Sequence, residues 1–94
     1  MASITVKFYS LWRVYLGVDS ATLQADNLNE ALAQVEERFG SRLREQLQAE
    51  GVQIAGKIPD YSLILLNGTS LRNLKHTNLK EGDTLQVFPP ATGG

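Results

Sequence analysis

The residues best suited to chemistry stand at the end of the sequence, in the run Phe88-Pro89-Pro90-Ala91-Thr92-Gly93-Gly94. The two prolines hold φ at about −65° and donate no N–H, so they end a strand and stiffen the exit from it. The residues beyond them are small, and glycine has no Cβ, so this tail could enter a narrow pocket and place a carboxylate beside a reacting atom. Such a carboxyl group has a pKa of about 3.3–3.7, so at neutral pH it is a nucleophile with no proton to remove. The alternative is a frayed chain end without a function.

The rest of the sequence contains no recognisable catalytic or metal-binding pattern. The absence of cysteine excludes disulfides, thiolate ligands and a persulfide carried on the chain. His76 has no second histidine or cysteine to share a metal with, and no phosphate-binding loop, nucleophile elbow or dinucleotide fingerprint is present. Arg72, Lys75 and Lys80 form a small basic group with His76, which we interpret as a solvated face. We therefore expect neither a bound metal nor a cofactor.

Composition and charge describe an ordinary globular domain. The 94 residues are 43% hydrophobic and 20% charged, and their formal net charge of −1 argues against general binding to nucleic acid or an anionic membrane. Lys7 and Arg13 interrupt the apolar residues near the N-terminus, and no uncharged run is long enough to span a bilayer. The sequence predicts a soluble cytoplasmic protein, a free monomer, with one domain over 1–89 and a flexible tail over 90–94.

Two strands are predicted in the first part of the chain. Apolar and polar residues alternate over residues 3–9, which indicates a half-buried strand. A short helical turn is expected from Ser10 to Leu16, with Gly17 ending it. Residues 20–25 alternate again, and the short connection allows the two strands to form an antiparallel pair.

The clearest helix begins after the second strand. Asn27 and Glu30 resemble a capping box, which predicts a helix start. One apolar stripe follows at helical spacing: Leu28, Ala31, Leu32, Val35 and Phe39. We expect Gly40 to stop this helix in a left-handed conformation and a second, weaker helix to run over 41–50.

The remaining strands follow a loop over 51–60. The nearly continuous apolar run over 61–66 predicts a strand in a central position. Asn67-Gly68 is the strongest hairpin signal in the chain and predicts a short return strand over 69–71. The last strand is expected over 84–88. Strand, strand, helix and further strands indicate an α+β fold in which the helix packs across a mixed sheet with the terminal strand in its middle.

The sequence resembles the small sulfur-carrier proteins of the MoaD/ThiS type, which are ubiquitin-like β-grasp domains. The resemblance covers essentially the whole chain, and the proline pair followed by the terminal diglycine is its most specific part. It includes the following segments: Val6-Lys7-Phe8, Leu11, Arg13, Leu16 and Gly17, the helix from Leu28 to Phe39, Leu66-Asn67-Gly68, Leu79-Lys80-Glu81-Gly82-Asp83, and Val87-Phe88-Pro89-Pro90 with Gly93-Gly94. It implies a mixed sheet of about four to five strands with the main helix on one face.

The resemblance also implies a protein cosubstrate rather than an enzyme, of a kind that can act as the small subunit of a synthase complex. A ubiquitin-activating-type adenylyltransferase would condense the Gly94 carboxylate with ATP, and a sulfurtransferase persulfide would then leave a thiocarboxylate. A sulfur-accepting synthase subunit would use this sulfur, most typically in molybdopterin biosynthesis. ATP and Mg²⁺ would belong to the activating partner. The residues concerned would be Gly94 as the reacting residue and Gly93, Thr92, Ala91 and Pro90 as its tail.

Four further residues are candidates for partner contact: Phe88, Pro89, Tyr9 and Arg13. Phe88 alternates out of phase with the inward residues of its strand, so it is expected on the exposed sheet face as an apolar anchor, with ordinary edge packing as the alternative. Arg13 either contacts an acidic partner group or caps its short helix. Two other functions stay open: a ubiquitin-like modifier joined through Gly94 to lysines of target proteins, and a binding module with an inert tail.

Overall fold

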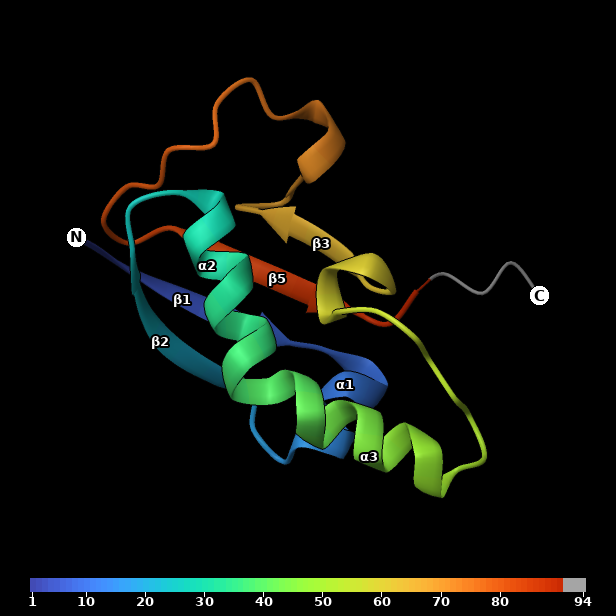
Figure 1. The fold of residues 1–94 in the computed structure, drawn as a ribbon. Helices are drawn as coiled ribbons and strands as arrows, with labels where there is room; N and C mark the ends of the chain where they lie inside the picture. Colours follow the sequence, from blue (N-terminus) through green and yellow to red (C-terminus); the bar gives the residue numbers. More distant parts are fainter. Residues whose placement is uncertain (91–94) are drawn as a thin grey trace.

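Five strands form one mixed sheet in the order β2-β1-β5-β3-β4 (Figure 1). In this computed structural model, which describes residues 1–90, the strands are β1 Ala2–Phe8, β2 Ser20–Ala25, β3 Leu63–Leu66, β4 Thr69–Ser70 and β5 Thr84–Phe88. β1 pairs antiparallel with β2 and parallel with β5. β3 pairs antiparallel with both β5 and β4. The predicted β-grasp fold, with the terminal strand in the middle of the sheet, is therefore confirmed.

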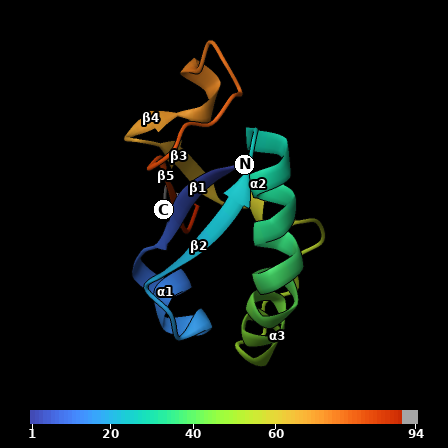
Figure 2. The ribbon, with the colours of Figure 1, turned by 90° about the vertical axis from the view of Figure 1, so that its left-hand side faces the viewer.

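Three α-helices accompany the sheet: α1 Ser10–Leu16, α2 Leu28–Val35 and α3 Ser41–Ala49. α2 and α3 follow one another along the same face of the sheet, and α1 lies at the end where β1 finishes (Figure 2). Short 3₁₀ turns, η2 at Ile58–Asp60 and η3 at Leu71–Asn73, lie on either side of the β3–β4 hairpin in the sequence. Within residues 1–90, no helix has the length and apolar character that crossing a bilayer requires.

The prediction that Gly40 stops the main helix is wrong. Gly40 has φ −61°, and the chain passes from α2 into α3 through a π-helical turn, η1, at Glu36–Gly40. The carboxylate of Glu36 occupies the space where a Cβ at position 40 would lie. Glycine is required here by this close approach within a continuous helix, and its freedom to adopt positive φ is not used.

The predicted core faces are largely confirmed. Ile4, Val6 and Phe8 of β1 are at most 2% exposed, and they pack with apolar residues of the helices and of the other strands. The edge of the Phe8 ring contacts Phe39, with ring centroids 4.9 Å apart. Ile58, which the sequence placed in a loop, is fully buried and belongs to this core.

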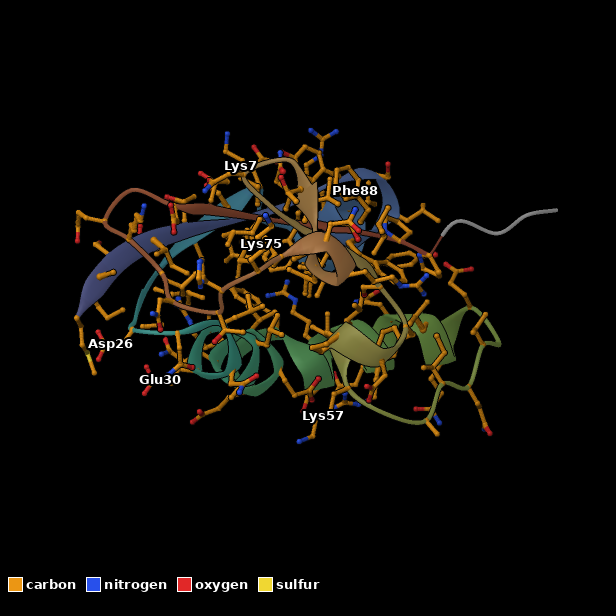
Figure 3. All side chains as sticks on the ribbon, turned by 90° about the horizontal axis from the view of Figure 1, so that it is seen from above. Lys7, Asp26, Glu30, Lys57, Lys75 and Phe88 are labelled. Carbon is orange, nitrogen blue, oxygen red and sulfur yellow. The ribbon has the colours of Figure 1, made fainter. Side chains whose placement is uncertain are left out.

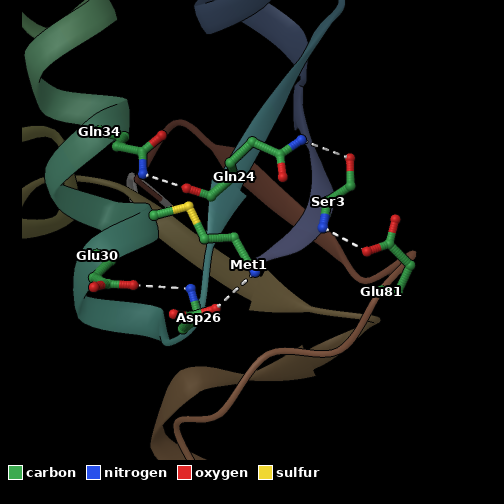
Figure 4. A network of polar contacts seen from close by, with 7 residues as sticks. All are labelled: Met1, Ser3, Gln24, Asp26, Glu30, Gln34 and Glu81. Carbon is green, nitrogen blue, oxygen red and sulfur yellow. Dashed lines mark hydrogen bonds and ion pairs between the residues drawn. The ribbon is translucent and has the colours of Figure 1, made fainter.

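The start of α2 is fixed by its cap, as predicted. The Glu30 N–H donates to Asn27 Oδ1 over 2.9 Å, while the Glu30 carboxylate accepts from the Asp26 N–H over 2.8 Å. In a standard capping box the Glu30 carboxylate would accept from the N–H of Asn27, but here it accepts from the N–H of the preceding residue, Asp26. Figure 4 shows that the Met1 ammonium also approaches Asp26, at 3.7 Å, and that Gln34 Nε2 donates to the Gln24 carbonyl over 2.7 Å. These contacts hold the helix start against β1 and β2.

The β3–β4 hairpin turns at Asn67-Gly68, where φ is 50° and 85°. Positive φ at both positions is typical of a two-residue hairpin turn, so the turn prediction is confirmed. The strand over 61–66, expected in a central position, lies between β5 and β4, although β4 is only two residues long. Leu63 is 43% exposed, because it alternates with the buried Ile64 and Leu66 and lies on the other face of the sheet.

Candidate partner-binding surface at the root of the tail

Tyr9 and Phe88 stack face to face where β5 leads into the tail. Their ring centroids are 4.4 Å apart and their planes differ by 13°. Phe88 projects from the sheet on the side opposite α2 and α3, the same side as Lys7 (Figure 3). The predicted position of Phe88 on the exposed sheet face, with Tyr9 beside it, is confirmed, whereas its role in partner binding stays a prediction.

Leu63 extends this pair across a third strand, and sequence reasoning did not select it. It lies opposite Phe88 in the β3–β5 register, so its side chain shares the exposed face with Phe88. We call Tyr9, Phe88 and Leu63 the apolar row. The signal was present in the sequence, because strand alternation leaves Leu63 and Leu65 out of phase with the buried Ile64 and Leu66. The nearly continuous apolar run concealed this alternation.

Arg13 lies at one end of the apolar row, in the last turn of α1. Its Nε is 3.7 Å from an Asp19 carboxylate oxygen, and both side chains are mostly exposed. Arg13 and Asp19 line a shallow groove of about 270 Å³ together with Lys7, Phe8, Tyr9 and Ser20. An exposed ion pair of this kind adds little stability, so Arg13 remains available to an acidic group of a partner.

Trp12 attaches α1 to the start of β3. Its ring is 3% exposed, and its Nε1–H donates to Ser62 Oγ over 2.8 Å. Ser62 directly precedes β3, so this bond ties α1 to the strand that carries Leu63. Leu11 and Val14 of the same helix are 52% and 66% exposed. The bond from Trp12 thus fixes the start of β3, and with it Leu63, relative to α1.

The carboxylate with a shifted pKa lies on the other face of the sheet. Burial raises the pKa of Glu36, but hydrogen bonds from Arg44 and the Ile58 N–H, together with the Arg44 charge, outweigh burial and lower it. The distances are 2.7 Å to Arg44 Nη2 and 2.8 Å to the Ile58 nitrogen. The hydrogen bond to Glu36 in turn raises the pKa of Arg44. This pair secures the loop before β3 to the helices and takes no part in the apolar row.

The structure brings some of the predicted site residues together, whereas the predictions for others fall outside the described residues. Tyr9, Arg13, Phe88 and Pro89 lie together at the sheet end from which the tail leaves. The predictions for Ala91, Thr92, Gly93 and Gly94 fall outside the described residues. Within residues 1–90, no three carboxylate, histidine or cysteine side chains gather as a metal site would require. The described residues thus form a partly apolar, partly charged surface where the chain leaves β5, and binding of a partner there stays a prediction.

Comparison with known proteins assigns the class. The model of the ThiS family matches residues 14–94, so the chain belongs to the ThiS family, whose members are ubiquitin-like sulfur-carrier proteins. The match includes the diglycine. No curated protein sequence matches the chain.

Solved structures with the same fold come from archaea and bacteria. The small archaeal modifier protein 1 of Methanosarcina acetivorans is 24% identical with a TM-score of 0.70, and the match covers 100% of this chain and 98% of that one. A putative molybdopterin converting factor subunit 1 from Pyrococcus furiosus is 23% identical, with a TM-score of 0.62 and coverage of 96% and 99%. A chain in the complex of subunits 1 and 2 of the molybdopterin-converting factor from Helicobacter pylori is 25% identical, with a TM-score of 0.60 and coverage of 98% and 99%.

Proposed function

We propose that this protein carries sulfur on the carboxyl group of Gly94. The proposal is supported by the family match, which extends through the diglycine, and by the place where the chain leaves β5. Pro89 and Pro90 follow β5 next to Phe88 of the apolar row, so a partner that binds the row would hold the start of the tail in place. From Pro90 to Gly94 an extended tail could reach roughly 16–18 Å. The apolar row is the observation that carries the proposal.

The chemistry has three steps. The Gly94 carboxylate attacks the α-phosphorus of ATP and releases pyrophosphate, which gives an acyl-adenylate. The terminal sulfur of a sulfurtransferase persulfide attacks the acyl carbon and displaces AMP. A thiol then takes up the other persulfide sulfur as a disulfide, and the thiocarboxylate is released on Gly94. The sulfur passes to a synthase subunit for molybdopterin or related biosynthesis.

In this proposal the partners supply the catalysis. The tail has no cationic side chain, so cations of the activating enzyme and its Mg²⁺ must offset the repulsion between the carboxylate and the triphosphate. The protein is then a cosubstrate that holds no cofactor of its own. The Helicobacter pylori protein occurs in a complex with a second subunit, and this supports a comparable synthase subunit as a partner here.

Deleting Gly94 tests the proposal. We expect the deletion to abolish ATP-dependent adenylation by the activating enzyme and to leave the melting temperature unchanged, because the buried core of residues 1–90 ends at Val87. Intact-mass measurement after incubation with ATP, activating enzyme and persulfide donor would show one oxygen replaced by sulfur in the full chain. Normal adenylation of the shortened chain would refute the mechanism.

The alternative is a protein modifier joined through Gly94 to lysines of other proteins. The structural similarity to a small archaeal modifier protein favours it. Both functions require the same activated carboxyl group, and they differ in whether a persulfide or an amine attacks it. Mass spectrometry of cell material separates them, because a carrier yields a free thiocarboxylate and a modifier yields Gly94 attached to lysine side chains.

A further inference from the structure

The outer edge of β3 is open over its first half. β4 pairs only with Leu65 and Leu66. No strand among residues 1–90 therefore covers the outer edge at Leu63 and Ile64. An uncovered edge presents backbone groups to which another chain can pair.

The backbone groups at this open edge can be identified. The Asn67 N–H bonds to the Thr84 carbonyl at the start of β5, and successive residues of a strand direct their N–H and C=O groups to opposite edges. The groups of Ile64 and Ser62 therefore face away from β5. The Ile64 N–H and the Ser62 carbonyl have no backbone hydrogen-bond partner within the described part of the chain. One donor and one acceptor are thus spaced to hold one residue of an added strand.

A groove of about 440 Å³ lies along this edge, between the turns η2 and η3. Its lining is mixed, with apolar side chains of β3 and η3 beside polar ones. The lining residues that matter here are Ser62, Leu63, Ile64, Leu71, Asp60 and Arg72. The groove is therefore large enough for a short extended segment and is bounded at both sides.

The two charged side chains of the groove differ in their interactions within the described residues. Asp60 Oδ2 accepts a hydrogen bond from the Lys57 N–H over 2.9 Å, so it is used in capping η2. Arg72 is exposed and makes no ion pair within residues 1–90, and Lys75 follows in the same loop. The side of the groove formed by η3 is therefore suited to a carboxylate.

We propose that this groove binds an extended peptide segment of a partner protein, which adds to β3 as a further strand. Its backbone pairs with the Ile64 N–H and the Ser62 carbonyl. An apolar side chain lies beside Leu63 and lengthens the apolar row, and an acidic side chain lies against Arg72. The inference does not depend on activation of Gly94.

A second copy of this chain fits the groove less well. The open edge is short and recessed between η2 and η3 in every copy, so two such edges cannot approach one another closely. A single extended strand has no flanking turns and can enter. The short edge also limits unspecific edge-to-edge association.

The test uses the full chain, labelled with ¹⁵N, and a synthetic probe. The probe is an acetylated and amidated heptapeptide of alternating valine and threonine that ends in two glutamates, and a second peptide has lysines in place of the glutamates. We expect saturable amide shifts at residues 62–64 and 70–72 with the acidic probe, and at least tenfold weaker binding of the basic one. A probe N-methylated on the edge that pairs with β3 is expected not to bind, whereas methylation of its opposite edge should be tolerated.

Arg72→Glu and Arg42→Glu form a matched pair of charge reversals. Arg42 lies on α3 beside Gly17, on the helical side, so only Arg72→Glu should weaken the acidic probe, by about tenfold. Equal weakening in both variants, shifts confined to other surfaces, or no shift at millimolar probe would overturn the proposal. Concentration-dependent shifts at residues 62–64 without peptide would identify a second copy as the occupant. A tenfold gain in probe affinity after removal of residues 91–94 would identify the tail of the same chain as the occupant of the groove. Either of these last two results would refute the proposal that a partner segment binds there.

Discussion

Phe88 occupies the last position of β5, and its ring is half-buried through its stack on Tyr9. Val87 beside it is fully buried in the core. Neighbouring residues of one strand thus lie in different environments, because successive side chains point to opposite faces of the sheet. Alternation in the sequence was sufficient to predict this difference, whereas the stack on Tyr9 depends on the parallel pairing of β1 with β5.

We expect Phe88→Asp to weaken binding of the activating enzyme at least tenfold and to lower the free energy of unfolding by less than about 1.5 kcal/mol. Val87→Ala is the matched control. It removes buried methyl groups and should cost about 2 kcal/mol without changing the exposed face. Urea unfolding and calorimetric titration measure the two effects. A larger loss of stability in Phe88→Asp than in Val87→Ala would show that Phe88 serves the core.

Glu36 should make stability dependent on pH. Its pKa in the folded protein is lowered, on balance, by the hydrogen bonds from Arg44 and Ile58 against the opposing effect of burial. A lowered pKa contributes stability that is present above the unfolded value of about 4.3 and is lost as pH falls through the folded value. Glu36→Gln should therefore be less stable than the parent at pH 7. The difference in unfolding free energy should stay constant from about pH 8 to 5 and shrink below about pH 4. A difference that does not change at acid pH would mean that the Glu36 charge is not the cause.

At the scale of elements, the continuous passage from α2 into α3 depends on Gly40. The sequence suggested a stop, because glycine after an apolar stripe often ends a helix. The structure uses the missing Cβ instead, since the Glu36 carboxylate lies over Gly40 while it binds Arg44 and the Ile58 N–H. The contacts of Glu36 thus accompany the π-helical turn, a local irregularity in the helix.

Gly40→Ala should therefore destabilise the protein by about 1–2 kcal/mol, because the methyl group displaces the Glu36 carboxylate from its hydrogen bonds. An exposed helical glycine would show the opposite sign, with a gain of about 1 kcal/mol for alanine. In a Glu36→Ala background the loss should disappear. Chemical unfolding of the two single variants and the double variant gives the coupling energy, and additive effects would contradict the proposed contact.

At the scale of the whole molecule, we predict that the core folds without the tail. The apolar core of the described residues extends to Val87 and no further. The family match shows that the chain is a member of the ThiS family, and its proposed activity requires only that the fold present the tail to a partner. In the sequence, Pro89 and Pro90 stand between the last strand and the residues proposed to react.

A chain shortened after Pro90 should unfold within about 2 °C of the full chain, because it keeps every core residue found in the described part of the chain. Its far-ultraviolet circular dichroism should also be unchanged. Activation by ATP and the activating enzyme should be lost completely. A drop of 5 °C or more would show that residues 91–94 pack on the domain, and the boundary predicted between 1–89 and 90–94 would then be wrong.

The sequence by itself determined the strand faces, the start of α2 at Asn27, the turn at Asn67-Gly68 and the likeness to a diglycine carrier. The first three rest on local periodicity or turn chemistry, which a short window of residues contains, whereas the likeness rests on family motifs spread over the whole chain. Only the tertiary structure decided the open edge of β3 and the role of Gly40. These depend on which strands become neighbours and on contacts such as that between Glu36 and Ile58, 22 residues apart. Interactions between distant parts of the chain decide them, and local patterns do not contain that information.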